Sequence, residues 1–534
     1  MTEQRPSILI AATPTPNGDL HVGHLAGPYL AGDVYARFLR ACGRPVSYTT
    51  CTDDSQSYVV TTASRRGTSP HQLCAASTEA ISHSLAEMGI SIEPLPPIDS
   101  QYRQCVLDFM ARLQATGRLR ERTVRLPYAT RSERYLYDGL VTGRCPVCSA
   151  TSCGGACEDC GHPNNFDELL DATYTLDPSE PVSYRQERIL VLPMEEYRQQ
   201  LTSYFHAHAS GWRPHPMQLV RELLARPLPD IPITMPGRWG IPAPFAPTAG
   251  QVVYPWAEAM PASMYSTWHA AGGLDSPIAE LDGYWRAERN AEVVYFHGFD
   301  NTYHWGLMDL TLLMAHGDRY VLPSANICNE FYELEGSKFS TSRNHLMRGG
   351  ELLAELPRDL IRFYLAMTAP EQRRTNFTVD SLHELSRRRL VEPWNALADR
   401  VAQIVERADT VSLPTTAAGR GRAKEMLERL RQCYQLPTFS MTRAAQTIAG
   451  ELVRLAGTDT STVPGDLLLA SRTLLAGASP ILIDLAEQAS ADGLELGFGS
   501  TPPDTMPVRA LPRLFVRAGD RAGQLAEPAL ARRA

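Results

Sequence analysis

Residues 7–24 read SILIAATPTPNGDLHVGH, in which a short apolar run passes through a proline-containing loop into the start of a helical pattern. An apolar run of this length that turn-forming residues interrupt is typical of a buried strand. Apolar positions then recur at helical spacing over 25–39, until residues 43–45 (GRP) stop the helix. Residues 46–51 (VSYTTC) form a second strand-like run. Strand, loop, helix and strand in this order predict the beginning of a doubly wound parallel sheet.

The loop and the first helical turn carry groups suited to a phosphate. At the carboxyl edge of a parallel sheet, a helix N-terminus offers N–H groups and a partial positive charge. His21 and His24 share one helix face, so both can donate to phosphate oxygens. Gly23 lets a nucleotide approach the backbone closely, and Asn17 and Gly18 shape the preceding loop. Taken alone, such a histidine pair is more often an incidental helical pair or half of a metal site.

Residues 336–342 (GSKFSTS) supply a second signal far downstream. In adenylyl transfer, catalysis is mainly positioning and charge stabilisation, so cations and hydrogen-bond donors matter more than a nucleophile. Lys338 on a mobile loop would add a point charge to the triphosphate as pyrophosphate develops, whereas a lone lysine is usually a solvated surface residue. Together the two segments resemble the paired nucleotide-binding signatures of a known enzyme family, and this resemblance implies an ATP site with His21, His24 and Lys338 as its catalytic groups.

Five of the eleven cysteines fall within 145–160, and four of them form two Cys-x2-Cys pairs: Cys145, Cys148, Cys157 and Cys160. Four thiolates at this spacing predict a closed, tetrahedral zinc site with a structural role. Cys153 lies between the pairs and is expected to be a bystander. The alternative is a loop with free cysteines. Cysteines gathered at metal-ligand spacing favour a reducing cytoplasm over a disulfide framework.

The composition is that of a globular protein of several domains, with 534 residues, 43% hydrophobic and 21% charged residues, and a net charge of -8. This charge excludes a generally basic nucleic-acid binder but leaves room for a local basic patch. No run of about 18 apolar residues occurs, so no membrane span is expected. The N-terminal residues lack the pattern of a secretory signal, and we therefore expect a cytoplasmic protein.

The two signatures resemble the HIGH-type and KMSKS-type sequences of class I aminoacyl-tRNA synthetases. The chain resembles methionyl-tRNA synthetases, particularly their archaeal-type branch, to about residue 490. Further matching segments occur in the same order, namely HLAG (24–27) continuing to AGD (31–33), RWGIP (238–242), YPWAEA (254–259) and NEF (329–331). The resemblance implies an α/β fold in which a Rossmann-like doubly wound parallel sheet carries a zinc-knuckle insertion and precedes a C-terminal α-helical bundle.

The pattern along the chain divides it into five ranges. We expect the first half of a Rossmann-like catalytic domain at 1–118, a connective insertion at 119–230 with its zinc knuckle at 145–160, the second half of the catalytic domain with the lysine loop at 231–378, an anticodon-binding-like helical bundle at 379–490, and a weakly ordered tail at 491–534. Long amphipathic runs such as 423–434 and 442–455 predict the bundle. A composition rich in Pro, Ala and Arg predicts the tail.

The resemblance also implies roles for single residues. Expected ATP contacts are Asn17, Gly18, Gly23, Gly298, Asp300, Phe339, Ser340 and Ser342, with Asp300 at the ribose. Mg²⁺ would accompany the triphosphate. Expected amino-acid contacts are Ala12, Thr13, Thr15, Asp54, Trp256, Ala259 and His304. Asp54 would meet the α-ammonium group, because a buried ammonium needs a carboxylate partner. Trp256 and His304 resemble aromatic positions of the methionine pocket.

Several positions depart from the family pattern around this pocket. Thr13 and Thr15 stand where an apolar residue and a tyrosine usually line the methionine side chain. Further departures are Ser-Gln-Ser at 55–57 for a His-Gly pair, Ile-Thr-Met-Pro at 233–236 for a segment with an arginine, Thr341 for the second signature lysine, and a spacing from Asp300 to His304 that is one residue short. Because unpaired hydroxyls weaken a thioether pocket, the threonines indicate a smaller or more polar amino acid. The alternative is a repacked methionine pocket.

The predicted bundle departs from the family as well. Family members read the anticodon with asparagines early in the bundle and an aromatic residue later. Bases splayed from a loop need stacking platforms and edge-reading amides, and Trp394 and Asn395 are the candidates here. A buried packing role is the alternative for Trp394. Residues 387–389 (RRR) could meet tRNA phosphates, although such a run is more often a solvated helix face.

The reaction that the resemblance implies is attack of an amino-acid carboxylate on the α-phosphate of ATP, giving an aminoacyl-adenylate and pyrophosphate. Transfer to an acceptor follows, with methionine and tRNA as the default pair. One alternative is a specialised paralogue that activates another amino acid for a small-molecule acceptor in a biosynthetic pathway, without tRNA. Another is a catalytically silent binding or regulatory paralogue. The intact His21, His24, Asp54, Asp300 and Lys338 argue against it. We expect a monomer.

Overall fold

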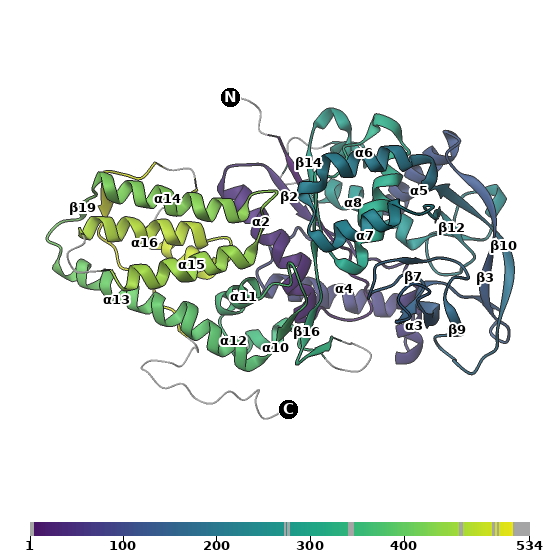
Figure 1. Ribbon diagram of the computed structural model, residues 1–534, viewed down its shortest axis with the longest axis horizontal. Coiled ribbons are helices and arrows are strands. Elements are labelled where there is room, and N and C mark those ends of the chain that lie inside the picture. Colours follow the sequence, from purple (N-terminus) through teal and green to yellow (C-terminus); the bar gives the residue numbers. More distant parts are fainter. Residues whose placement is uncertain are drawn as a thin grey trace. The chain divides into compact units, whose positions relative to one another are not determined.

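The computed structural model of the chain describes residues 5–271, 274, 278–339, 346–458, 463–493, 497–498 and 501–515. The chain divides into two compact units, each built from separate stretches of sequence. The first unit comprises Met1–Leu20, Pro45–His83 and Ile92–Asn329. The second comprises His21–Arg44, Ser84–Ser91 and Glu330–Ala534. Helices and strands carry the labels of Figure 1.

The first unit contains a four-stranded sheet in the order β15-β14-β1-β2. Its strands are β1 (Ser7–Ala11), β2 (Val46–Thr49), β14 (Glu292–Gly298) and β15 (Ala325–Asn329). Each neighbouring pair is parallel. β1 is buried over its whole length, which explains why its sequence is a continuous apolar run and not an alternating one. The sheet confirms the predicted α/β fold.

The helices of the first unit are α3 (Ser57–Arg66), α5 (Ser100–Ala115), α6 (Arg198–His208), α7 (Pro214–Leu224), α8 (Pro255–His269) and α9 (Asp309–Met314), while α4 (Pro70–Glu87) runs from the first unit into the second. Two of them, α5 and α8, illustrate recognisable start signals. The Asp99 side chain caps α5 by accepting from the backbone N–H groups of Gln101 and Tyr102. Proline at the first position of α8 fits the helix start, where no backbone donor is needed.

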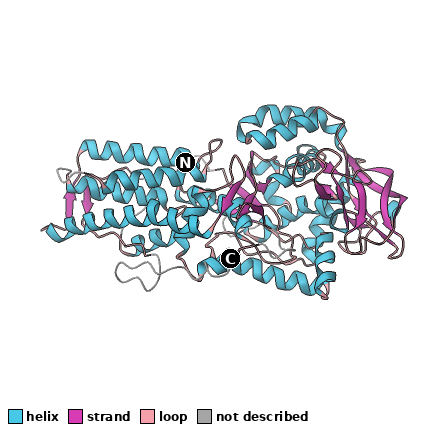
Figure 2. Ribbon diagram, turned by 60° about the horizontal axis from the view of Figure 1, so that its bottom comes forward, coloured by secondary structure: helices cyan, strands magenta, loops and turns pink. Residues whose placement is uncertain are grey.

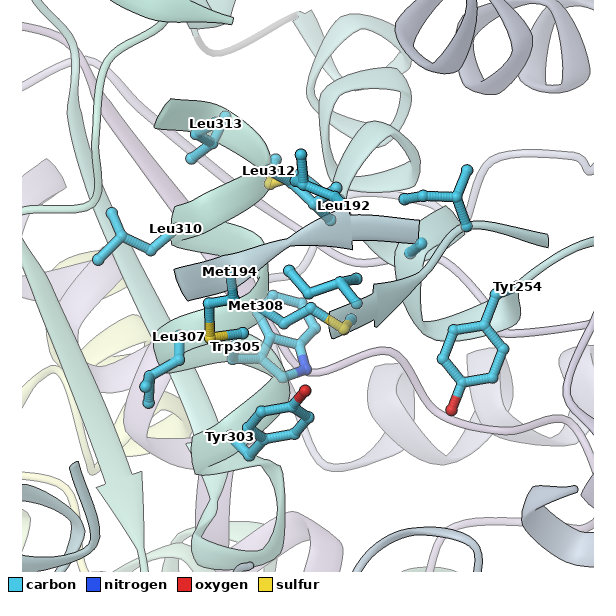
Figure 3. Packing of buried hydrophobic residues seen from close by; sticks show 14 of the residues in the cluster. Leu192, Met194, Tyr254, Tyr303, Trp305, Leu307, Met308, Leu310, Leu312 and Leu313 are labelled. Carbon is cyan, nitrogen blue, oxygen red and sulfur yellow. The ribbon is translucent and has the colours of Figure 1, made fainter. Parts of the chain in front are cut away.

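A second, antiparallel sheet of the first unit has the order β11-β10-β3-β4, and it comes from the predicted insertion except for β11, which extends beyond residue 230. It consists of β3 (Arg120–Ala129), β4 (Arg134–Tyr135), β10 (Val182–Pro193) and β11 (Asp230–Pro232). Leu192 of β10 and the adjacent Met194 belong to the same buried cluster as Trp305 and Met308. Figure 3 shows these side chains packed together. The insertion therefore shares the hydrophobic core of the four-stranded parallel sheet.

The second unit is mainly helical (Figures 1 and 2). Its helices include α2 (Leu30–Ala41), α10 (Gly349–Leu353), α11 (Arg358–Met367), α12 (Val379–Ser386), α13 (Glu392–Arg407), α14 (Ala417–Tyr434), α15 (Met441–Ala456), α16 (Pro464–Ala478) and α17 (Ile483–Ala491). Phe38 of α2 stacks on Tyr434 of α14 with ring centroids 5.5 Å apart. The predicted C-terminal helical bundle is confirmed.

Residues 501–515 fall in the range predicted as a weakly ordered tail. Within them β20 (Thr505–Pro507) pairs antiparallel with β19 (Ser412–Pro414), and Met506 is fully buried. The amino-acid composition of this range predicted a tail. Composition does not reveal that its backbone pairs with the distant strand β19.

Among the described residues, the structure contains no helix that is both long and apolar enough to cross a membrane.

Candidate functional site

The histidine pair stands at the start of α1 (Val22–His24) in the second unit. The His24 backbone N–H donates to His21 Nδ1 at 3.4 Å, and the His21 N–H donates to His24 Nδ1 at 3.3 Å. The two rings are stacked with centroids 3.7 Å apart. Because each Nδ1 accepts a hydrogen bond, a neutral ring carries its hydrogen on Nε2. Both histidines can therefore act as donors through Nε2, as a phosphate site requires.

Phe339 extends this stack on the other side of His21, with ring centroids 4.6 Å apart and an interplanar angle of 10°. A Cβ atom at Gly23 would come within 3.0 Å of the His21 ring and 3.2 Å of the Phe339 ring. Only glycine therefore fits beneath these rings without a shift. Val22 N–H donates to Met347 O at 2.8 Å, so residues on both sides of 340–345 meet α1. The structure brings the predicted His21, Gly23, His24 and Phe339 together.

The remaining predicted residues of the lysine loop are only partly described. Lys338 ends β17 (Ser337–Lys338), whose backbone pairs with Glu333 of β16 (Tyr332–Leu334). The predicted ATP contacts Ser340 and Ser342 lie outside the described residues.

In the first unit, the carboxyl ends of β1 and β2 meet. Thr50 Oγ1 donates to Ala11 O at 2.8 Å, and Asp53 N–H donates to Pro14 O at 3.1 Å. The predicted amino-acid contacts Ala12, Thr13 and Thr15 are partly buried in the loop after β1. The predicted ATP contact Asn17 closes a turn in that loop, with Asn17 N–H donating to Thr15 O at 2.8 Å, and Gly18 follows it.

Asp54 follows β2 and is partly buried. Burial raises the pKa of its carboxyl group, while the neighbouring Thr52 and Cys74 side chains work in the opposite direction. Its buried Oδ1 has no hydrogen-bond partner in the part of the chain that the structure describes. The Trp239 indole donates to the Asp54 backbone carbonyl at 2.7 Å, which fixes the local backbone. An ammonium group is a donor that could satisfy such a carboxylate oxygen.

Trp256 of α8 stacks on His304, with ring centroids 3.6 Å apart and planes inclined by 5°. Burial lowers the pKa of His304 to about 3, so its imidazole is neutral. Ala259 lies one turn after Trp256 and is buried. Trp256 Nε1 and His304 Nδ1 are buried without a hydrogen-bond partner among the described residues. The structure therefore brings the two predicted aromatic residues into one flat stack with polar edges.

The insertion supplies one wall of this stack. Gly155 has φ +89°, and a Cβ atom there would lie 3.3 Å from Trp256 Nε1 and 3.2 Å from Asp138 Oδ1. Burial raises the pKa of Asp138 to about 7, and Tyr254 donates its hydroxyl to Asp138 Oδ1 at 3.0 Å.

The predicted ribose-binding segment follows β14. Gly298 ends the strand and Asp300 lies in the short turn 299–301. Asn301 Nδ2 donates to Asp300 Oδ1 at 3.2 Å. A Cβ atom at Gly298 would lie 2.5 Å from Asp300 Oδ1, so a glycine here lets the carboxylate fold back over the strand end.

Sequence reasoning singled out neither Glu258 nor Asp53, two buried acidic residues of the first unit. Glu258 is 1% exposed and its Oε1 accepts from Ser55 Oγ at 3.0 Å and Tyr102 OH at 2.7 Å. Burial raises the pKa of Glu258 to about 7. Burial and the nearby Glu258 also raise the pKa of Asp53 well above its ordinary value. The available signal was one acidic residue among the otherwise apolar residues 255–262 that begin α8.

The four predicted cysteine ligands form a cluster in the first unit, with all sulfur atoms within 4.8 Å of one another. Cys145 Sγ lies 3.7 Å from Cys160 Sγ, and Cys148 Sγ lies 3.6 Å from Cys157 Sγ. A tetrahedral site with Zn–S bonds of about 2.3 Å separates its sulfur atoms by about 3.8 Å, so these distances fit zinc. Cys153 is not part of the cluster, as predicted.

The same turn supports both Cys-x2-Cys pairs. Ser149 N–H donates to Cys145 O at 2.9 Å, and Gly161 N–H donates to Cys157 O at 2.7 Å. Both donors have positive φ, 64° at Ser149 and 73° at Gly161. Each turn points its two thiols to the same side, which is the geometry of a knuckle.

A Rossmann-type parallel sheet, a His-x-x-His helix start and a downstream lysine segment define the class I aminoacyl-tRNA synthetases. The fold matches that of the Mycobacterium tuberculosis methionyl-tRNA synthetase bound by methionyl-adenylate, with a TM-score of 0.72, 19% identity, and coverage of 96% of this chain and 99% of that one. The sequence model described as tRNA synthetases class I (M) matches residues 8–402. The chain belongs to this family, which confirms the resemblance; membership of the archaeal-type branch stays a prediction.

Curated relatives carry the name methionine–tRNA ligase. The Chlorobium limicola protein is 31% identical over 383 residues, which cover 70% of this chain and 54% of that protein. The Christiangramia forsetii protein is 28% identical over 456 residues, which cover 84% of this chain and 65% of that protein. The chain thus spans between about half and two thirds of the length of these relatives.

Proposed function

We propose that the chain activates methionine with ATP to methionyl-adenylate, releases pyrophosphate, and transfers the methionyl group to tRNA. The observation that carries this proposal is the family match over residues 8–402, together with the stacked His21, His24 and Phe339 at the first signature. The proposal includes a cytoplasmic location and a monomeric state.

The chemical step needs charge stabilisation more than a nucleophile from the protein. A carboxylate oxygen of methionine attacks the α-phosphorus, and the bond between that phosphorus and the bridging oxygen of pyrophosphate breaks. His21 and His24 would donate through Nε2 to phosphate oxygens as negative charge moves onto the leaving group. Lys338 would add its positive charge to pyrophosphate, and Mg²⁺ bound to the triphosphate would neutralise further charge.

The amino acid would be held by its two ends. Asp54 would accept from the α-ammonium group, because its buried Oδ1 has no donor among the described residues. The flat stack of Trp256 and His304 would contact the side chain, and a thioether sulfur packs favourably against aromatic rings. Ala12, Thr13, Thr15 and Ala259 are proposed to complete the pocket. Asn17, Gly18, Gly298 and Asp300 are proposed to contact ATP.

The thiols of Cys145, Cys148, Cys157 and Cys160 would hold one zinc ion with a structural role, because four thiolates close the tetrahedron and leave no position for substrate.

Methionine-dependent exchange of pyrophosphate into ATP, run without tRNA, tests the activation step. Each standard amino acid is assayed in parallel, and Lys338→Met serves as the control for a contaminating synthetase. Exchange with methionine that the Lys338→Met variant loses supports the proposal, and charging of tRNA with methionine is the next test. Exchange with another amino acid alone would overturn methionine as the substrate. Silence with every amino acid would overturn activation itself.

A further inference from the structure

The loop between β12 (Thr234–Met235) and β13 (Val252–Val253) lies against the turn that carries Asp54. It contains the RWGIP segment at 238–242, for which the proposed function gives no role. The loop and the turn both belong to the first unit. The contacts of this loop bear on the direction in which the Asp54 carboxylate points.

The two peptide groups that flank the Asp54 Cα atom are both hydrogen bonded. Asp53 O accepts from Gln56 N–H at 3.3 Å, within the turn itself. Asp54 O accepts from the Trp239 indole N–H at 2.7 Å, so the second peptide group is held by a distant part of the sequence. Because the backbone at a Cα atom limits the rotamers of its side chain, these two bonds restrict the direction of the Asp54 carboxylate.

Trp239 is itself held by the two helices that follow this turn. Its ring packs against four buried side chains of α3 and α4, namely Val59, Ala63, Leu73 and Cys74. The ring of His71, also in α4, meets it edge-on with centroids 4.8 Å apart. A donor that packing already holds in place forms its hydrogen bond with little further loss of side-chain entropy.

The loop is also tied to the strand that leads into α8. Val253 N–H donates to Ile241 O at 2.8 Å, which joins the end of the loop to β13. Directly beyond this strand, α8 begins at Pro255 and carries Trp256. The loop therefore connects the backbone of Asp54 with the backbone that carries Trp256.

The hydrogen bond to Asp54 O separates Trp239 from two simpler roles. The indole has a single N–H donor, and the carbonyl already takes it, so this donor is not available to a substrate. Packing alone does not need a donor, because a phenylalanine ring offers the same kind of apolar surface. The N–H group is thus the feature of Trp239 that packing does not explain.

We propose that Trp239 is a positioning residue for the amino acid, which aims the Asp54 carboxylate at the α-ammonium group and holds it at a set position relative to Trp256. The proposal deepens the proposed function and rests on it through the role of Asp54. Trp239 acts through Asp54, so its effect should disappear when the Asp54 carboxylate is removed.

A double-mutant cycle tests this dependence. Trp239→Phe keeps an aromatic ring and removes the donor. We expect the KM for methionine in pyrophosphate exchange to rise about 3–10-fold, as for loss of one hydrogen bond, and the KM for ATP to stay unchanged. In the Asp54→Asn background the same change should alter the KM for methionine by less than about twofold. An unchanged KM in Trp239→Phe, additive effects in the cycle, or an equal rise in both KM values would overturn the proposal.

Trp268→Phe is the matched control. Trp268 is partly buried like Trp239, and its Nε1 donates to Ile278 O at 2.8 Å, but it lies outside the proposed site. This variant should leave both KM values unchanged. If it raises the KM for methionine as much as Trp239→Phe does, the effect is a general loosening of the fold and the proposal is overturned.

Hydrogen exchange of the backbone amides over residues 53–57 needs no substrate and separates the two possible failures. Trp239→Phe should speed hydrogen exchange there, and Trp268→Phe should not. Unchanged hydrogen exchange in Trp239→Phe would overturn the proposal even in an active enzyme. Faster hydrogen exchange in a protein whose wild type shows no methionine-dependent pyrophosphate exchange would instead overturn the proposed function, and with it the role of Asp54 through which Trp239 acts.

Discussion

His21 combines two roles that substitution can separate, because its ring nitrogen caps α1 while the ring stacks between His24 and Phe339. Asparagine also caps helices through its side-chain oxygen, so His21→Asn should keep the helix start but lose the ring donor. We expect kcat for methionine-dependent exchange to fall about 10²–10³-fold, the range for loss of one charge-stabilising donor. Thermal unfolding should be unchanged. Full activity, or a fall in stability that accounts for the loss, would contradict the proposed role.

Asp54 and Asp53 are adjacent carboxylates for which the structure predicts different consequences of the same substitution. Asp54→Asn removes the proposed acceptor of the α-ammonium group, and we expect KM for methionine to rise about 10–100-fold, as for loss of a hydrogen bond to a charged group. Asp53 is buried, and burial together with the nearby Glu258 raises its pKa well above the ordinary value, which disfavours the charged form that an ammonium group would need. Asp53→Asn is therefore the matched control, with KM expected within about threefold of wild type. Equal effects of the two substitutions would contradict the assignment of Asp54.

Glu258 should make the free energy of unfolding depend on pH. Burial raises its pKa from 4.5 to about 7, so between these values the folded protein binds a proton that the unfolded chain releases. Its contribution to stability is present below pH 4.5 and is lost as pH rises to about 7. Glu258→Gln cannot titrate, and relative to wild type it should gain about 3 kcal/mol from pH 4.5 to 8. Urea unfolding of both proteins at pH 5, 6, 7 and 8 measures this difference. If the free energies of unfolding of the two proteins differ by the same amount at every pH, the prediction is wrong.

Some site residues could be predicted from the sequence and others could not. The histidine pair and the cysteine pairs follow spacings that only a few structures produce, and the structure brings each set together. Glu258 follows no such spacing, and its raised pKa comes from burial that the sequence does not reveal. Thr13 and Thr15 are visible departures in the sequence, but the amino acid that fits beside them depends on the packing of the proposed pocket, which sequence spacing does not reveal.

At the scale of elements, the first helix illustrates a local failure of the helical pattern. The apolar spacing predicted one helix over 25–39, whereas the structure has a π-helical turn at Leu25–Tyr29 before α2 begins at Leu30. Pro28 lies inside this turn and has no N–H to donate, and Gly27 leaves the helical conformation with ψ -115°. Strand β1 was predictable because a strand buried on both faces is apolar throughout.

The knuckle of the insertion is the element for which metal removal gives the clearest prediction. The hairpins that carry the four thiols are short, with β6 at Thr151–Cys153 and β7 at Gly155–Ala156, so the ion would supply much of their stability. We expect the purified protein to contain about one zinc per chain, and Cys157→Ser to lose it with faster hydrogen exchange over 141–174.

Cys153→Ser is the matched control, because Cys153 lies in the same loop but outside the cluster. It should retain zinc and normal exchange. Since a Cβ atom at Gly155 of the knuckle would lie 3.3 Å from Trp256 Nε1, a shift of the knuckle on loss of zinc should also raise KM for methionine. Zinc retained in Cys157→Ser would contradict the four-thiol site.

At the scale of the whole molecule, the second unit is assembled from three separate stretches of sequence, and one buried arginine joins them. Arg362 of α11 donates to Asp33 Oδ2 at 2.6 Å, to Ile481 O at 2.9 Å and to Met88 O at 3.2 Å. Both Arg362 and Asp33 are fully buried. Asp33 lies in the range 25–39 that the sequence predicted as a helix, but helical spacing does not show which distant segment covers a face of that helix.

The Asp33–Arg362 pair should therefore dominate the stability of this unit. Arg362→Met would leave a buried carboxylate without its main cation, and we expect the free energy of unfolding to fall by about 3–5 kcal/mol. Adding Asp33→Asn should recover part of that loss, since a neutral amide does not need the cation. Urea unfolding followed by hydrogen exchange of α2 and α11 measures both steps. A double variant no more stable than Arg362→Met would show that packing, and not charge, sets the loss.

The pH dependence of the same pair has a definite sign. Burial alone would raise the pKa of Asp33, but Arg362 and Arg37 lower it below the ordinary value of 3.8. The unfolded chain therefore takes up the proton first, so the contribution of Asp33 is complete above pH 3.8 and is lost as pH falls through the lowered value. In Arg362→Met, burial dominates and the pKa of Asp33 should rise, so that stability now improves as the solution is acidified from pH 7. The control is the double variant Asp33→Asn with Arg362→Met, in which Asp33 cannot titrate. If the free energy of unfolding of Arg362→Met falls relative to this control on acidification from pH 7, the electrostatic account is wrong.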